Sequence, residues 1–230
     1  MWTEESPADR GGLVVDSRLS HPERAAATGT FGAVVLGGGA ARRMGGVDKP
    51  GVAVGGLPMR DRVLAAASAA EPVVLVGPPV DVPPGVLVTR EDPPGGGPVA
   101  ATAAGVAALG GAGAEPEFVA LLAADLPFLT AGAVRLLATA LSRSGSADGV
   151  VYLDGSGRRQ PLCGVWRTAA LRAALDRLAQ RDDGTLTGAA MGALLDELSV
   201  EELRWTRPGP PPWFDCDTGD DVRRAEEWTR

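Results

Sequence analysis

Short apolar runs alternate with longer alanine-rich or amphipathic segments along most of this chain, and the links between them are short. The apolar runs predict buried strands at 31–36, 72–76, 85–89, 117–125, 149–154 and 161–166. The longer segments predict helices at 58–70, 98–109, 130–143, 168–181, 186–198 and 218–230. Such alternation is typical of a mostly parallel sheet with helices on both faces. We therefore expect a three-layer α/β/α, Rossmann-like domain over 30–230, preceded by a flexible tail at 1–29.

Composition and charge narrow the class of protein. The 230 residues carry a formal net charge of -7, and 22% of them are charged, which is typical of a soluble globular protein. Nucleic-acid binding usually needs a basic surface, so we expect no nucleic-acid partner. We expect a cytoplasmic protein, because the first residues form no apolar secretory core and no run is apolar enough to span a membrane. Cys163 and Cys216 are then expected to be free thiols.

Two residue types are almost absent, and this limits the available chemistry. The only histidine is His21, in the N-terminal tail, which argues against histidine-based nucleophilic catalysis and histidine metal sites. The only lysine is Lys49, and every other basic residue is an arginine. An ammonium is a compact point charge, whereas a guanidinium is a planar fork. One lysine kept inside a glycine-rich loop therefore indicates a function for that charge.

The loop "GGGAARRMGGVDKP" follows the first predicted strand. Its glycines let backbone N–H groups approach an anion closely. It is not a dinucleotide fingerprint, because Arg42 stands at the sixth position, and it is not a Walker A loop, because Lys49 lies between an aspartate and a proline. Arg42, Arg43 and Lys49 add three cations, which favours a polyphosphate ligand over a plain glycine-rich turn.

Carboxylates follow several of the predicted strands. Asp125 ends the predicted strand at 117–125, and Glu91 with Asp92 follows the strand at 85–89. Parallel strands end at one edge of a sheet, where ligands bind, so Asp125 is well placed to hold Mg²⁺. Each acid could instead belong to a solvated turn or cap a helix, and for the Asp215–Asp217 stretch before the last helix capping is a strong alternative.

These motifs together resemble the molybdenum cofactor guanylyltransferase (MobA) family, which belongs to the MobA-like NTP transferases. The similarity lies in "VVLGGGAARRMGGVDKP", "EDPPGGGPVAA" and "DLPFL", and it extends over roughly 31–228. It implies the sheet of a nucleotide-diphospho-sugar transferase and the transfer of GMP from GTP to molybdopterin, with Mg²⁺ as cofactor and release of pyrophosphate. The implied nucleotide-binding residues are Leu36, Gly37, Gly38, Gly39, Lys49, Asp92 and Asp125.

The resemblance also implies catalytic and metal-binding roles. Lys49 and Arg42 would neutralise phosphate charge, and Asp125 with Asp217 would bind Mg²⁺. The terminal stretch "DCDTGDD" has Asp215 and Asp217 where the family usually has two asparagines, so substrate preference and metal affinity stay open. The alternatives are a transferase that uses CTP or another NTP on molybdopterin or a different phosphorylated acceptor, and a non-catalytic nucleotide-binding relative. Transient contact with proteins that insert or accept the molybdenum cofactor is a further expectation.

Overall fold

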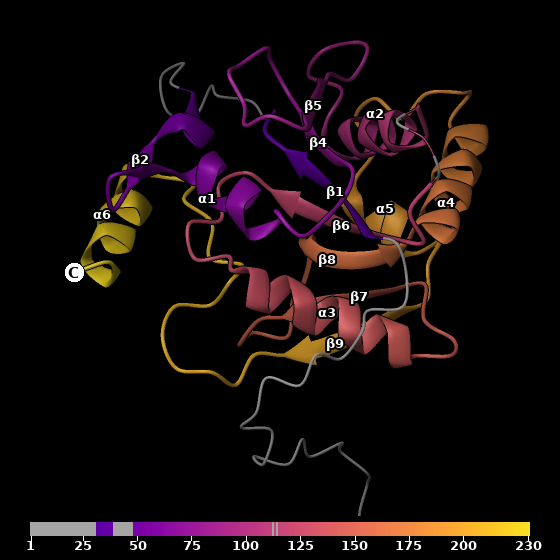
Figure 1. Cartoon of the computed structure of the whole chain (residues 1–230). Helices are drawn as coiled ribbons and strands as arrows, with labels where there is room; N and C mark the ends of the chain where they lie inside the picture. The colour runs from indigo at the N-terminus through magenta and orange to yellow at the C-terminus, as the bar shows by residue number, and fades with distance from the viewer. Residues whose placement is uncertain (1–30, 39–47, 112, 114) are drawn as a thin grey trace, which may run out of the picture.

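The computed structural model describes residues 31–38, 48–111, 113 and 115–230 (Figure 1). The expected tail at 1–29 and the candidate residues Gly39, Arg42 and Arg43 lie outside the described residues.

Within the described residues, seven strands form one twisted sheet in the order β5-β4-β1-β6-β8-β7-β9. All neighbouring strands run parallel except that β8 is antiparallel to both β6 and β7. The expectation of a mostly parallel α/β sheet is therefore confirmed. The strands are β1 (Phe31–Leu36), β4 (Val73–Val76), β5 (Val86–Thr89), β6 (Phe118–Ala123), β7 (Gly149–Leu153), β8 (Arg159–Arg167) and β9 (Val200–Arg204).

Helices cover both faces of this sheet (Figure 1). On one face, α1 (Met59–Ala66) and α3 (Ala131–Arg143) bury their apolar sides against alternate residues of the strands. On the other face lie α2 (Pro98–Gly111), α4 (Thr168–Arg181) and the short α5 (Met191–Leu195). The helix α2 approaches the sheet closely because Gly105 has no side chain, and a Cβ there would overlap the Val34 side chain.

A small third unit lies at the left of Figure 1 and joins a segment near the start of the described chain to its C-terminal helix. The hairpin of β2 (Ala53–Val54) and β3 (Leu57–Pro58) packs against α6 (Gly219–Trp228). Buried Val54, Met59, Cys216 and Ala225 form its core. This packing brings the segment before α6 next to the short 3₁₀ helix η2 (Lys49–Gly51).

Several predicted boundaries were wrong, and two features were missed. The predicted helix at 186–198 is helical only at Met191–Leu195, because Gly188 adopts a left-handed φ of 77° just before it. The helix α1 ends at Ala66 rather than at residue 70, since the Glu71 N–H donates to Phe31 O (2.7 Å) as the chain turns into β4. The strand β9 was missed because its sequence, VEELR, is largely polar and mostly exposed. The β2–β3 hairpin was missed because its strands have two residues each.

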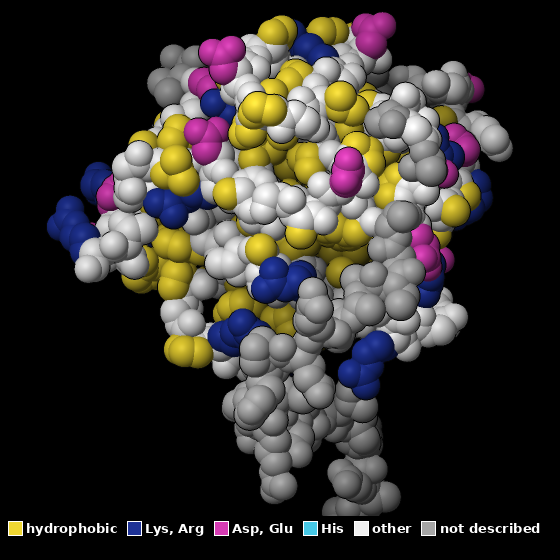
Figure 2. Space-filling view, viewed as in Figure 1, with side chains coloured by type: hydrophobic (Ala, Val, Ile, Leu, Met, Phe, Trp, Pro, Cys, Tyr) yellow, Lys and Arg dark blue, Asp and Glu magenta, His cyan; other side chains and the backbone are white. Residues whose placement is uncertain are grey.

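None of the helices in the described part of the chain combines the length and apolar character needed to cross a membrane. On the face shown in Figure 2, basic side chains are separated by apolar and neutral surface rather than gathered into one patch.

Candidate active site

The carboxyl edge of the sheet gathers the candidate residues from distant parts of the sequence. Gly37 and Gly38 follow β1, and Asp125 follows the neighbouring strand β6, whose Ala123 pairs with Leu36. Lys49 comes from η2, and Asp217 comes from the segment before α6. The structure therefore brings Lys49 into contact with Asp125 and with Asp217, which is 168 positions away in the sequence.

Lys49 lies between two carboxylates. Its ammonium forms an ion pair with Asp125 Oδ2 and a second one, at 2.7 Å, with Asp217 Oδ1. The side chains of Lys49 and Asp125 are 19% and 18% exposed, whereas that of Asp217 is 55% exposed. The three predicted residues thus form one cluster that is sheltered on the β6 side and open to solvent on the α6 side.

Burial alone would lower the pKa of Lys49, but hydrogen bonds and attraction from the two carboxylates outweigh it and leave the pKa above its ordinary value. Lys49 therefore keeps its charge at neutral pH. A charged ammonium at this edge can neutralise either the two carboxylates or the phosphates of a bound nucleotide.

The segment that carries Asp217 is held in place at both ends. The Cys216 N–H donates to the main-chain oxygen of Asp125 (3.3 Å), which ties this segment to the end of β6. Thr218 caps α6, since its hydroxyl accepts from Asp221 N–H (3.2 Å) and the Asp221 carboxylate accepts from Thr218 N–H (2.8 Å). The strong capping alternative for this stretch therefore applies to Thr218, and Asp217 remains directed at Lys49.

Asp215 adds a further carboxylate to this edge. Partial desolvation, followed by the charges of Asp217 and Asp125, raises the pKa of Asp215 above its ordinary value. The carboxylates repel one another, and Lys49 only partly offsets that repulsion. The cluster is therefore suited to receive an additional cation.

The two described glycines of the opening loop form a narrow corner. Gly37 N–H and Gly38 N–H both donate to Val76 O, at 2.8 and 3.1 Å, and so continue the pairing of β1 with β4. Gly77 lies directly against them, because a Cβ on Gly77 would come within 3.2 Å of the Gly37 and Gly38 backbone. Contacts from Gly37 and Gly38 to a nucleotide would then use their carbonyl groups and α-carbons, since these two amides are already bonded.

Glu91, rather than Asp92, faces this glycine corner. Glu91 is 8% exposed, and its carboxylate lies about a van der Waals distance from the position that a Gly38 Cβ would occupy. Its Oε1 accepts from Gly95 N–H (2.9 Å), while Oε2 is buried without a described partner. Asp92 is exposed. The sequence named both acids after this strand, but the resemblance assigned the nucleotide contact to Asp92, and no signal in the sequence could tell which one turns inward.

A cavity of about 370 Å³ adjoins the Lys49 cluster on the other side. Its walls come from the loop between β7 and β8 and from the segment before α6. The lining residues are Asp154, Arg158, Gln160, Pro211, Trp213, Phe214, Asp215 and Asp217. The glycine corner beside β1, β4 and β5 and the cavity beside β7 and β8 therefore lie on opposite sides of β6, the strand that Asp125 follows.

The donors for a metal ion are few. Among the residues described by the structure, no group of three or more histidine, cysteine or acidic side chains is arranged to hold an ion. Asp125 and Asp217 converge on one point, which Lys49 occupies. Mg²⁺ is commonly held by one or two carboxylates together with substrate phosphates, so this donor set fits Mg²⁺ brought in with a nucleotide.

Lys49, Asp125 and Asp217 lie at the carboxyl edge of an α/β sheet, which is where proteins of this fold class bind their ligands. Residues 33–197 match the family model described as the MobA-like NTP transferase domain. The chain belongs to this family of nucleotidyltransferases. No curated protein matches the chain.

Solved structures share the fold at low identity. Molybdopterin-guanine dinucleotide biosynthesis protein A from Archaeoglobus fulgidus is 20% identical, with a TM-score of 0.63 over 85% of this chain and 97% of that chain. The 2-C-methyl-D-erythritol 4-phosphate cytidylyltransferase from Thermus thermophilus is 22% identical, with a TM-score of 0.57 over 84% and 96%. Its counterpart from Francisella tularensis is 10% identical, with a TM-score of 0.65 over 87% and 100%. A protein of molybdopterin-guanine dinucleotide biosynthesis and two cytidylyltransferases therefore share this architecture.

Proposed function

We propose that the protein is a cytoplasmic, Mg²⁺-dependent enzyme that transfers GMP from GTP to molybdopterin and releases pyrophosphate. The observation that carries this proposal is the convergence of Lys49 on Asp125 and Asp217 at the carboxyl edge of the sheet. A nucleotide's phosphates would bind at this point, with the acceptor in the adjoining cavity. The similarity to the A. fulgidus protein supports the choice of acceptor only as an analogy of fold.

The reaction needs charge neutralisation more than proton transfer. A phosphate monoester is already mostly ionised at neutral pH, so an oxygen of the acceptor phosphate can attack the α-phosphorus without a general base. The bond from the α-phosphorus to the bridging oxygen then breaks, and pyrophosphate leaves with that electron pair. In the bound state Lys49 would move from the carboxylates to the phosphates and stabilise the growing negative charge. Arg42, which the sequence assigns to the same loop, would assist it.

Asp125 and Asp217 are the residues that would hold Mg²⁺ once Lys49 turns towards the nucleotide. The ion would supply charge neutralisation on the α-phosphate and on the leaving pyrophosphate. Asp217 stands where the family usually has an asparagine, and a second carboxylate would bind the ion more tightly than an amide.

Glu91 favours guanine at the glycine corner. Its buried Oε2 lacks a described partner, and a carboxylate can accept hydrogen bonds from both the N1–H and the N2 amino group of guanine. Cytosine offers a single amino group at the corresponding edge. Replacing Glu91 by Gln should therefore weaken GTP binding about tenfold or more and affect CTP less, as measured by calorimetry with each nucleotide and Mg²⁺.

The test of the proposed function is an assay of folded protein with Mg²⁺, molybdopterin and either GTP, CTP, ATP or UTP. We expect pyrophosphate and the guanine dinucleotide with GTP and a much slower reaction with the others. Faster turnover with CTP would make the protein a cytidylyltransferase. No product with any nucleotide, together with unchanged biological activity of Asp125→Ala, would identify a non-catalytic relative and end the proposal. Proteins that insert or receive the molybdenum cofactor are the proposed partners.

A further inference from the structure

We propose that the cavity between the β7–β8 loop and the segment 211–217 is the acceptor site, and that Arg158 binds the acceptor's phosphate while Trp213 stacks on its flat ring. This inference rests on the proposed function for its role in the reaction. It also makes a claim about binding that can be tested without any transfer reaction. The ligand class is a phosphate monoester carried by a flat heteroaromatic compound.

The cavity lies where a second substrate has to bind. Asp215 and Asp217 line it, and Asp217 is the residue that contacts Lys49. A molecule in the cavity would therefore lie next to the phosphates that Lys49 neutralises. The glycine corner with Glu91 belongs to the strands on the other side of β6. The nucleotide and the acceptor would therefore bind on opposite sides of that strand without overlapping.

Among the residues that the structure describes, Arg158 is the one cation that lines the cavity. Its backbone N–H donates to Asp154 Oδ1 (2.9 Å), and its guanidinium makes no ion pair with a described residue. A guanidinium without an acidic partner is available for a phosphate, which it can bind through two parallel hydrogen bonds. Arg158 is therefore the phosphate ligand of the proposed acceptor site.

The loop that carries Arg158 is well ordered by Asp154. The Asp154 carboxylate accepts hydrogen bonds from Ser156 N–H and Arg158 N–H, both at 2.9 Å, and from Ser156 Oγ (2.7 Å). Gln160 Nε2 donates to its other oxygen at 2.9 Å. These bonds lower the pKa of Asp154, so it stays ionised. Asp154 is thus a positioning residue for the loop, and the Gln160 amide oxygen remains available for a ligand N–H.

Trp213 offers a rigid flat surface in the same cavity. Its ring centroid lies 5.2 Å from that of buried Tyr152, and Tyr152 OH donates to Ala133 O (2.8 Å). The aromatic pair is therefore anchored to α3. Trp213 is only partly buried, so part of its ring is left for a ligand. Stacking on an aromatic ring favours planar heterocycles over extended sugars.

The acidic side chains around the cavity make phosphate binding dependent on a cation. The carboxylates of Asp215 and Asp217 would repel an acceptor phosphate at the inner end of the cavity. Lys49 and a bound cation offset that repulsion, so phosphate binding should be tighter with Mg²⁺ than without it. Asp154 also lines the cavity and stays ionised, so it adds to the repulsion, although its two oxygens already accept four hydrogen bonds.

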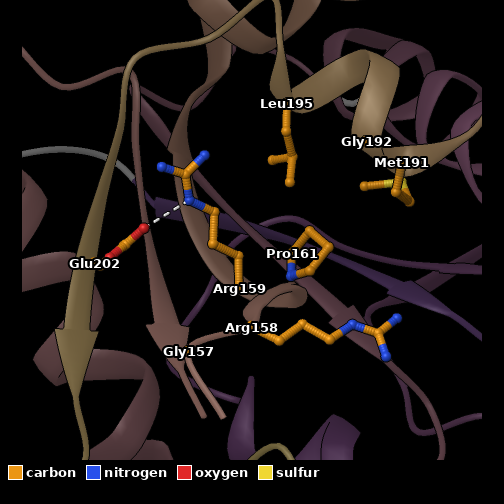
Figure 3. A pocket seen from close by; sticks show the side chains of 8 residues that line it. All are labelled: Gly157, Arg158, Arg159, Pro161, Met191, Gly192, Leu195 and Glu202. Carbon is orange, nitrogen blue, oxygen red and sulfur yellow. Dashed lines mark hydrogen bonds and ion pairs between the residues drawn. The ribbon is translucent and has the colours of Figure 1, made fainter.

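Arg159 provides a matched control. It follows Arg158 directly, but its guanidinium pairs with Glu202 at 2.8 Å, and the two arginine side chains diverge (Figure 3). Both arginines line a neighbouring cavity of about 550 Å³, together with Met191, Gly192 and Leu195 of α5. Arg159 does not line the smaller cavity beside Asp217, so its replacement changes the protein's charge without removing the proposed phosphate ligand.

The binding test uses flavin mononucleotide, a fluorescent flat-ring phosphate monoester, and riboflavin, which lacks the phosphate. Titrations contain Mg²⁺ and α,β-methylene-GTP, which keeps the nucleotide side filled, and are repeated without both. We expect flavin mononucleotide to be quenched on binding, Arg158→Gln to weaken it at least about tenfold, and Arg158→Lys to restore part of the affinity. Arg159→Gln should bind like the parent protein, and riboflavin should be insensitive to Arg158→Gln. Equal flavin mononucleotide affinity in Arg158→Gln and Arg159→Gln would overturn the proposal.

Kinetics separate this inference from the proposed function. Arg158→Gln should raise the KM for molybdopterin while leaving GTP affinity unchanged. If the parent protein forms no dinucleotide but still binds flavin mononucleotide through Arg158, the proposed reaction fails and the anion site stands. If transfer occurs and Arg158→Gln leaves the acceptor KM unchanged, the reaction stands and the acceptor assignment fails.

Discussion

Lys49 has two competing partners in this account, the carboxylates in the nucleotide-free protein and the phosphates in the complex. Replacing Lys49 by Met keeps the length of the side chain and removes its charge. We expect kcat/KM for nucleotidyl transfer to fall on the order of 10²–10³-fold, because one preorganised charge at a transition state is worth about 3–4 kcal/mol. The same substitution should make the nucleotide-free protein bind Mg²⁺ more tightly, because the ion no longer competes with the ammonium for Asp125 and Asp217.

The expected change in Mg²⁺ affinity depends on how exposed the two ion pairs of Lys49 are to solvent. Fully exposed ion pairs contribute about 0.2–1 kcal/mol, and breaking a fully buried one costs about 3–5 kcal/mol. The side chains of Lys49 and Asp125 are 19% and 18% exposed and that of Asp217 is 55% exposed, so these pairs lie between the limits. If Mg²⁺ must displace ion pairs worth about 1–2 kcal/mol in the parent protein, removing the ammonium makes Mg²⁺ binding roughly tenfold tighter in Lys49→Met.

The assay is calorimetric titration of Mg²⁺ into nucleotide-free protein, together with steady-state kinetics of pyrophosphate release. Lys49→Arg is the control, because it keeps the charge and should leave Mg²⁺ affinity near that of the parent while only partly supporting transfer. The reasoning is refuted if Lys49→Met binds Mg²⁺ no more tightly than the parent, or if its kcat/KM stays within a few fold of the parent value.

Three further predictions concern stability. Gly105→Ala should lower the free energy of unfolding in urea by about 1–3 kcal/mol through overpacking against the sheet, whereas Gly110→Ala in the same helix meets only an arginine side-chain end and should not. Equal stability of the two variants would contradict the packing. Asp215→Asn should raise the melting temperature at pH 7.5, because a folded-state pKa above the unfolded value makes ionisation destabilising. The gain in melting temperature should vanish as pH falls below the ordinary carboxyl pKa of about 3.9. A gain that stays constant with pH would contradict the raised pKa of Asp215. Thr218→Ala removes the cap of α6 and should lower the free energy of unfolding in urea by about 1 kcal/mol. It should also weaken Mg²⁺ binding, because the cap holds the segment that carries Asp217. An unchanged urea midpoint would exclude the capping role.

The sequence predicts the sheet because its buried strands are continuous apolar runs, as in Phe31–Leu36 and Phe118–Ala123. The sequence does not predict β9, because this strand is polar and mostly exposed and is held in the sheet by its pairing with β7. Its hydrogen bonds depend on a partner strand 51 positions earlier in the sequence, and no local periodicity encodes that partner.

The residues of the candidate site are likewise only partly predictable from the sequence. Asp125 and Lys49 are predictable, since one ends a buried strand and the other is the only lysine in a glycine-rich loop. Glu91 is not, because the choice between adjacent acids depends on the turn after β5 and on the Gly95 N–H that holds the carboxylate. Arg158 and Trp213 also escape prediction, because only the fold brings the β7–β8 loop and the segment before α6 to the two sides of one cavity.

The most direct test of the central claim is a crystal structure of the protein with Mg²⁺ and a non-hydrolysable GTP analogue. We expect Lys49 to leave Asp217 and contact the phosphates, Asp125 and Asp217 to bind the ion, and the base to lie in the glycine corner against Glu91. A complex in which Lys49 stays paired with both carboxylates while the nucleotide binds elsewhere would contradict this expectation.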